Sequence, residues 1–289
     1  MEHKVIQKSN DVLYPFKKEW YDNQQIFYHG TSSVHCESIE RNGWSLNGQP
    51  YNMNDIKKIC KIFEDIGWEG TPKNSGYSVL RAYSLGGGDH YLKKKPVSFS
   101  QNYWTARNYS RNIGGETIHY LLLAIEDILF FVNNVEIQKQ YKDEIVKELK
   151  KCKDMQKICS NPEALDFEIE RYTKFLKNIS DGFLENAKVS CLSILKKYEN
   201  FKKIHFPVVY LIRATTEWFE DYSPILDLKT LEIRSKTNIP PESIIARIDF
   251  PKGVEHMMVI SNGPQATMWE KKSWNKRCQE NRMLEFQIE

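Results

Sequence analysis

The stretch Tyr28-His29-Gly30-Thr31 closes a short apolar run, Ile26-Phe27-Tyr28, and precedes an amphipathic stretch from Val34 to Leu46 that predicts a helix. A strand that ends in this way places an imidazole beside a glycine backbone. The imidazole can donate a hydrogen bond to a sugar hydroxyl, and a glycine without a Cβ lets a flat ligand group approach its N–H and C=O. The stretch therefore predicts a ligand-holding strand end, with an ordinary turn histidine as the alternative.

The segment from Val97 to Tyr109 predicts a second element of the same region. It begins as a short strand around Ser98-Phe99 and continues as a helix. Within that helix Tyr103, Ala106 and Tyr109 are spaced three residues apart, so they share one face. The pattern places aromatic rings close to the end of a strand.

A third segment carries a carboxylate on a predicted strand. Glu232 lies within the strand Leu231–Ser235, and the rigid turn Ile239-Pro240-Pro241 follows it. The proline turn leads into a further apolar strand, Ile244–Phe250. The sequence thus places a single acidic residue just ahead of a fixed turn.

Taken in this order, the three segments resemble the ADP-ribosyltransferase superfamily over about residues 26–252. That superfamily includes diphtheria-type toxins, poly(ADP-ribose) polymerases and RNA 2′-phosphotransferases. The resemblance implies an α+β fold with split antiparallel sheets, here carrying a helical insertion. It also implies that NAD is consumed as a substrate and that the protein is a mono-ADP-ribosyltransferase, a glycosyltransferase that releases nicotinamide.

The resemblance further implies roles for individual residues. Glu232 and His29 become the catalytic residues, because a carboxylate stabilises the oxocarbenium-like state formed when a glycosidic bond breaks and the histidine orients the ribose. An aromatic ring is expected to stack on nicotinamide. The implied cofactor-binding residues are His29, Gly30, Thr31, Ser98, Phe99, Tyr103 and Tyr109.

Two positions depart from the family pattern. Ser98 stands where the polymerase branch has tyrosine, and Thr230 stands where the arginine-modifying toxins have a second Gln or Glu. These departures keep open a catalytically inactive binding module of the same fold. An RNA 2′-phosphotransferase is the other alternative, and it would use Arg107 or Arg111 for the phosphate.

Composition indicates an intracellular enzyme. The chain has 289 residues, a formal net charge of +3 and 40% hydrophobic residues, which is enough for a packed core and too nearly neutral for bulk nucleic-acid binding. Its six cysteines show no spacing typical of a metal site or a disulfide framework. No run approaches the roughly twenty apolar residues that span a bilayer. We expect action in a cytosol, either that of the producing cell or that of a host reached by a secreted toxin or effector, with a protein acceptor favoured over a nucleic acid.

The remaining patterns predict the domain organisation. A helix is expected at Asn54–Ile66, then a glycine-rich loop whose Gly86-Gly87-Gly88-Asp89-His90 could cover NAD, then a buried strand at Ile118–Ile125. From about 135 to 203 the apolar period is helical, which predicts a three-helix insertion before a strand at Pro207–Ile212. The expected catalytic domain comprises residues 1–134 and 204–260, and residues 261–289 form a tail in which Trp269 and Trp274 dock or bind a partner.

Overall fold

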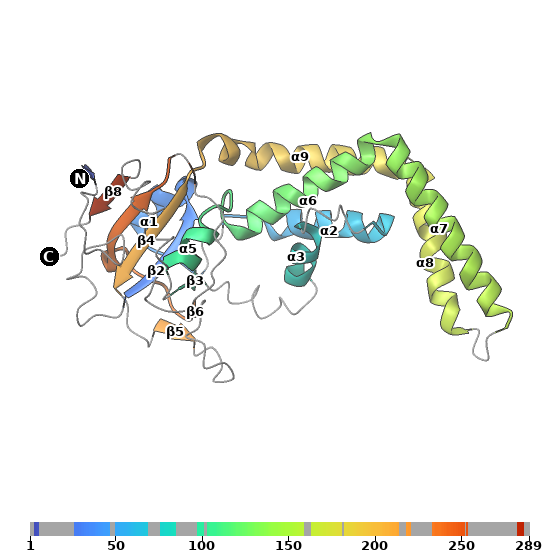
Figure 1. Cartoon of the computed structure of the whole chain (residues 1–289), viewed down its shortest axis with the longest axis horizontal. Coiled ribbons are helices and arrows are strands. Elements are labelled where there is room, and N and C mark those ends of the chain that lie inside the picture. The colour runs from blue at the N-terminus through green and yellow to red at the C-terminus, as the bar shows by residue number, and fades with distance from the viewer. Residues whose placement is uncertain are drawn as a thin grey trace, which may run out of the picture. The chain divides into compact units, whose positions relative to one another are not determined.

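The computed structural model describes the chain in segments that fall into two compact units. Described are residues 3–5, 26–46, 50–68, 76–84, 97–100, 103–158, 163–180, 182–213, 218–220, 233–251, 253 and 282–285. The first unit comprises Met1–Pro50, Tyr91–Ile118 and Phe201–Glu289, and the second comprises Tyr51–His90 and His119–Asn200. Figure 1 labels the elements of both. Helices and two small antiparallel sheets make the protein α+β, which confirms the coarse fold class.

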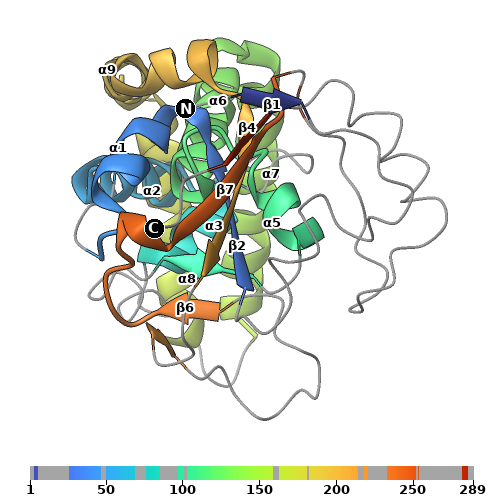
Figure 2. The ribbon, with the colours of Figure 1, turned by 90° about the vertical axis from the view of Figure 1, so that its left-hand side faces the viewer.

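The larger sheet of the first unit is antiparallel throughout. Its five strands lie in the order β1 (His3–Val5), β8 (Arg282–Glu285), β7 (Ile244–Asp249), β4 (Pro207–Arg213) and β2 (Ile26–Ser32). Figure 2 shows β2, β4 and β7 running side by side. The strands predicted at Pro207–Ile212 and Ile244–Phe250 are confirmed to within a residue. The strand β8 lies in the predicted tail, whereas Trp269 and Trp274 lie outside the described residues.

The smaller sheet is a short three-stranded one that meets the larger sheet at β2. Its order is β3 (Ser98–Phe99), β6 (Ile233–Ser235) and β5 (Phe219–Glu220). Just beyond β3, the N–H of Ser100 donates to the Tyr28 carbonyl at 2.8 Å and the N–H of Tyr28 donates to the Ser100 carbonyl at 2.7 Å. This bridge joins the edge of β2 to the smaller sheet.

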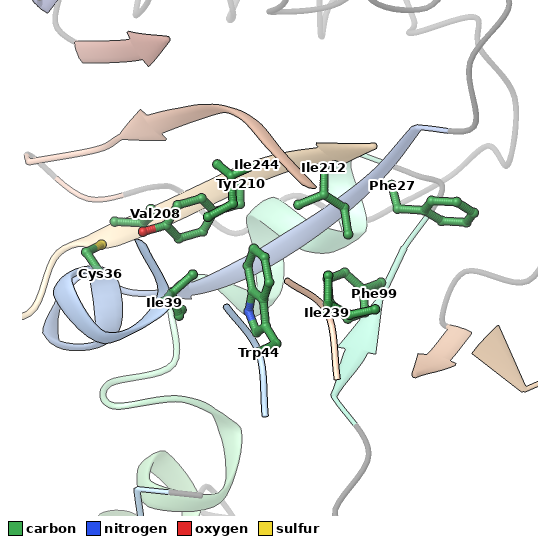
Figure 3. Packing of buried hydrophobic residues seen from close by; sticks show 10 residues of the cluster. All are labelled: Phe27, Cys36, Ile39, Trp44, Phe99, Val208, Tyr210, Ile212, Ile239 and Ile244. Carbon is green, nitrogen blue, oxygen red and sulfur yellow. The ribbon is translucent and has the colours of Figure 1, made fainter. Parts of the chain in front are cut away.

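Strand β4 supplies the core on both sides of the larger sheet, because successive side chains of a strand point to opposite faces. Val208, Tyr210 and Ile212 point to one face, where they pack with α1 (Cys36–Asn42) and with Trp44 (Figure 3). Val209 and Leu211 point to the other face, where they pack with α5 (Tyr103–Tyr109). The sheet is therefore covered on both sides, by α1 on one and α5 on the other.

Helix α1 is shorter than the helix predicted over Val34–Leu46. A 3-10 turn, η2 (Ser33–His35), precedes it, and Gly43 ends it with a positive φ of 68°. An ion-pair cluster ties α1 to the sheet: the Arg247 guanidinium donates to both oxygens of Asp249, at 2.7 and 3.0 Å, and also to Glu40 of α1. The Tyr210 hydroxyl donates to the same Glu40 carboxylate at 2.9 Å.

Helix α5 approaches β2 so closely that only a glycine fits beneath it. A Cβ added at Gly30 would lie 1.6 Å from the carbonyl oxygen of Ala106 and 2.9 Å from the backbone nitrogen of Ser110. Both atoms belong to the backbone, so a change of side-chain rotamer cannot relieve the overlap. Gly30 therefore sets the distance between α5 and the sheet, and Figures 1 and 2 show the two elements in contact.

The second unit is helical in its described part. It contains α2 (Met53–Ile66), α3 (Gly76–Ser84), α7 (Val135–Gln156), α8 (Glu163–Ser180) and most of α6 (Glu116–Asn133) and α9 (Phe183–Ile204). The helix predicted at Asn54–Ile66 and the three helices predicted between 135 and 203 are confirmed. Ile66, Phe131, Ile145, Phe175 and Ile179 form a core of this unit. The unit also includes 51–90 and 119–134, which the sequence analysis assigned to the catalytic domain.

The strand predicted at Ile118–Ile125 is wrong, because these residues lie in α6. The apolar run is continuous since the helix is buried around most of its circumference: Ile118, Leu121, Leu122, Ala124 and Ile125 are all at most 2% exposed. A short apolar run does not distinguish a buried strand from a buried helix.

Within the described residues no single helix meets the length and hydropathy of a membrane span. Helices α6 and α7 meet both criteria only as a pair, and this pair is bent by 88°.

We predict that Gly30→Ala lowers the free energy of unfolding by roughly 1–3 kcal/mol or more, because the added methyl overlaps the backbone of α5. Urea denaturation followed by circular dichroism measures the effect. Gly182→Asn is the matched control, since a Cβ at Gly182 meets nothing within 4 Å and asparagine tolerates its φ of 74°. An unchanged denaturation midpoint for Gly30→Ala contradicts the packing described here.

Candidate active site at the junction of the two sheets

His29 lies in β2 and its side chain reaches across to the smaller sheet. Its Nδ1 is 2.8 Å from the carbonyl oxygen of Ser98, and since a carbonyl only accepts, Nδ1 carries the proton. The half-buried ring packs against Phe99, with centroids 5.1 Å apart, and against Trp44 at 5.3 Å. The imidazole is thus fixed by one hydrogen bond and two aromatic neighbours.

The surroundings keep His29 neutral. Burial lowers the pKa of His29 from 6.5 to about 4; the Ser98 carbonyl opposes this shift, and nearby His35 adds to it. Burial also lowers the pKa of His35, whose Nε2 lies 2.9 Å from the Gly114 carbonyl oxygen. With Nδ1–H directed to Ser98, Nε2 of a neutral His29 has a lone pair and no proton. This corrects the expected polarity: Nε2 of His29 is a hydrogen-bond acceptor and not a donor.

Gly30 presents its backbone at the outer edge of β2. In an antiparallel strand the N–H and C=O of one residue point to the same side, and those of residue i+2 point there too. Tyr28 directs both groups to Ser100, so Gly30 directs its own to the same edge, one step beyond the bridge. The missing Cβ itself accommodates α5, not a ligand, which corrects the reason given for this glycine. Gly30 therefore carries one backbone donor and one backbone acceptor on the outer edge of β2.

The other predicted binding residues divide into exposed and buried ones. Ser98 is exposed beside His29, whereas Thr31 is buried in β2. Phe99 and Tyr103 are each 2% exposed, and both rings are enclosed in the two core clusters of the first unit. Tyr109, 38% exposed at the end of α5, is the predicted stacking residue that reaches the surface.

Glu232, the predicted catalytic carboxylate, lies outside the described residues, as do Thr230 and the loop Gly86–His90. In sequence Glu232 directly precedes β6, and β6 pairs antiparallel with β3 through Ser98 opposite Arg234 and Phe99 opposite Ile233. The structure therefore brings together the three segments that carry His29, Ser98 and the residue following Glu232.

Sequence reasoning missed two residues at this junction. Trp44 contacts His29, Phe99 and Tyr210, and its indole Nε1 is buried without a hydrogen-bond partner among the described residues. Its only sequence signal is its place just after the glycine that ends α1. Arg234 is buried on β6 directly opposite Ser98. An arginine two residues after a candidate catalytic glutamate could have drawn attention to it.

Other reactive groups in the first unit are built into the core. Ser32 Oγ is 2.8 Å from Nδ1 of His205, but Ser32 is fully buried, so no substrate reaches this pair. Burial raises the pKa of Cys36 to about 11, which keeps this thiol protonated and unreactive. Across the described ranges no group of three or more His, Cys, Asp or Glu side chains could hold a metal ion.

Comparison of the chain with protein-family models, with curated proteins and with solved structures finds no match. The functional argument therefore depends on the geometry of this junction and on the chemistry of its residues.

We predict that protein stability falls between about pH 7 and pH 5 and that His29 contributes to the fall. The folded state binds the His29 proton more weakly than the unfolded chain, so this contribution is complete above 6.5 and is lost as the pH falls towards about 4. Urea denaturation at both pH values measures it. His29→Asn, whose amide can still donate to Ser98, should reduce the pH dependence and leave the part due to His35. An identical pH dependence in His29→Asn is the contradicting result.

Proposed function

We propose that the first unit binds NAD at the junction of β2, β3 and β6 and that the protein is a mono-ADP-ribosyltransferase acting on a macromolecular acceptor, with a protein favoured. One observation carries the proposal. The His29-Gly30 edge of β2, the Ser98 strand and the strand that follows Glu232 lie far apart in the sequence, and they adjoin in the fold. These are the three segments that an ADP-ribosyltransferase site requires.

In this proposal His29 and Gly30 hold the nicotinamide end of NAD. A ribose hydroxyl donates to Nε2 of the neutral His29, whose orientation the Ser98 carbonyl fixes. The carboxamide of nicotinamide has one donor and one acceptor in a plane, so it complements the N–H and C=O of Gly30 at the edge of β2. Of the three predicted stacking rings Tyr109 is the exposed one, but its helix α5 covers the face of the sheet opposite to that of Trp44 and Phe99, so no ring is assigned to the pyridinium.

Glu232 supplies the charge for bond cleavage. The glycosidic bond between the ribose anomeric carbon and nicotinamide breaks, the electron pair leaves with neutral nicotinamide, and the anomeric carbon gains oxocarbenium character. A carboxylate beside the ribose stabilises this cation. A nucleophilic group of the acceptor then bonds to the anomeric carbon and loses its proton.

The structure gives less support to an RNA 2′-phosphotransferase. That reaction needs several basic side chains at the surface around a phosphate. Arg107 is 4% exposed with its guanidinium 5.8 Å from the ring centroid of Phe250, which leaves the exposed Arg111 as the remaining candidate. A reducing cytosol suits the thiols: Cys36, Cys152 and Cys191 are buried and form no disulfide.

Nicotinamide release from NAD by the purified protein tests the proposal. Glu232→Gln should lower the rate by about two to three orders of magnitude. His29→Asn should raise the KM for NAD by about 5- to 150-fold, corresponding to roughly 1–3 kcal/mol for a lost hydrogen-bond partner, because the asparagine reaches Ser98 but offers no acceptor at the Nε2 position.

Glu242→Gln is the control for this experiment, since Glu242 is an exposed carboxylate of η4 (Pro241–Ser243), close to Glu232 in sequence. It should retain wild-type turnover. If Glu242→Gln is inactive while Glu232→Gln is active, the catalytic role moves to Glu242. If wild-type protein releases no nicotinamide with or without cell extract, the chain is a binding module and not a transferase.

A further inference from the structure

Four helices of the second unit surround a groove of about 920 Å³. Helices α2 and α3 form one wall and α7 and α8 form the other; Figure 1 shows α7 and α8 as an antiparallel pair. Aromatic and charged side chains make up most of the lining, and the aromatic ones come from both walls: Phe63, Trp68, Tyr77, Tyr141, Phe167, Tyr172 and Phe175. Phe63, Tyr77 and Phe175 are at most 8% exposed, so the aromatic surface open to a ligand comes from Phe167 and from the partly buried Trp68, Tyr141 and Tyr172.

Stacking holds the aromatic floor of this groove in place. The ring centroid of Phe63 lies 4.3 Å from that of Tyr77 and 6.2 Å from that of Trp68, and the rings are nearly parallel in both pairs. Trp68 in turn packs on Phe131 at 4.8 Å. Phe167 is different, since it is 69% exposed on α8 at the side of the groove. A preorganised floor and one exposed phenylalanine are features of protein-binding surfaces.

Four of the lining side chains are carboxylates and three are cations, and they differ in how far neighbouring ion pairs neutralise them. Among the cations, Lys174 pairs with Asp65 at 2.7 Å and Arg171 pairs with Glu168 at 2.6 Å. Arg81 lies over the Tyr77 ring, 6.0 Å from its centroid.

Of the lining carboxylates, Glu148 pairs with Lys151. Glu64, Glu144 and Glu170 form no ion pair within the segments that the structure describes, and all three are exposed. They come from α2, α7 and α8, so they surround the aromatic floor from both walls. The groove is therefore complementary to an apolar ligand that carries positive charge at its sides.

We propose that this groove binds a basic amphipathic helix of a partner protein. Its apolar face would lie on the partly exposed rings of Trp68, Tyr141 and Tyr172, with Phe167 covering one side. Its Lys or Arg side chains would meet Glu64, Glu144 and Glu170. The carboxylates stand on three separate helices, which suits an extended helical segment better than a compact molecule with a single charge. The proposal concerns binding by the second unit alone and does not require transferase activity.

Fluorescence anisotropy of the full chain with a labelled peptide tests this proposal. The probe is a helix of Leu and Lys, with Leu at positions i, i+3, i+4 and i+7, and its counterpart has Glu in place of every Lys. Glu144→Gln/Glu170→Gln removes two groove charges. Asp143→Asn/Glu163→Gln removes two exposed charges from the same two helices outside the groove and is the matched control.

The Leu/Lys peptide should bind wild-type protein and the control with equal Kd, and the groove variant about tenfold more weakly, since each charge contact contributes modestly. Phe167→Ala should weaken binding as well, and the Leu/Glu peptide should not bind. The net charge of +3 would repel a basic peptide, so general attraction does not produce this pattern. The proposal is overturned if wild-type protein does not bind the Leu/Lys peptide, if it binds both peptides equally, or if the groove variant and the control have the same Kd.

Discussion

The hydrogen bond from Nδ1–H of His29 to the Ser98 carbonyl is the interaction on which the candidate site depends. It joins β2 to β3 beside the Tyr28–Ser100 bridge, so the edges of the two sheets meet at one fixed place. It also determines the chemistry: the same bond sets the tautomer, and burial lowers the pKa of the ring, so Nε2 is a neutral acceptor at physiological pH. The outward-facing backbone of Gly30 adds an amide recognition element one residue further along the strand.

Much of the fold follows from local patterns, because amphipathic periods and turn residues act over short distances. The strand-to-helix segment around Ser98 and the three helices between 135 and 203 were predicted from such patterns. The strand at Ile26–Tyr28 was predicted as well, but its expected end at His29 is wrong, because β2 continues through His29 to Ser32 in register with β4. The prediction failed at Ile118–Ile125, where a helix buried nearly all round has no polar face to reveal its period. Helices α2, α3 and most of α6 belong to the same unit as the helices between 135 and 203. This grouping depends on tertiary contacts, which a local sequence pattern does not reveal.

The sequence allowed us to predict which residues form the candidate site, but not the role of each one. A sequence indicates that His29 and Gly30 adjoin, yet the tautomer depends on Ser98, 69 positions away. The glycine looks suited to a ligand, whereas its missing Cβ is required by the Ala106 carbonyl of α5. Among three candidate stacking rings, burial separates Phe99 and Tyr103 from Tyr109. Each of these distinctions arises from packing between segments that are distant in sequence.

The most direct test of the central claim is a titration of the protein with NAD, followed by nitrogen NMR of its labelled histidines. In the proposed complex a ribose hydroxyl of NAD donates to Nε2 of His29, while the bond from Nδ1–H to Ser98 persists. We therefore predict that the Nε2 resonance of His29 shifts with saturable dependence on NAD and that its Nδ1 resonance changes little. The account is contradicted if saturating NAD leaves both His29 resonances unchanged, or if NAD binds equally well to folded His29→Asn.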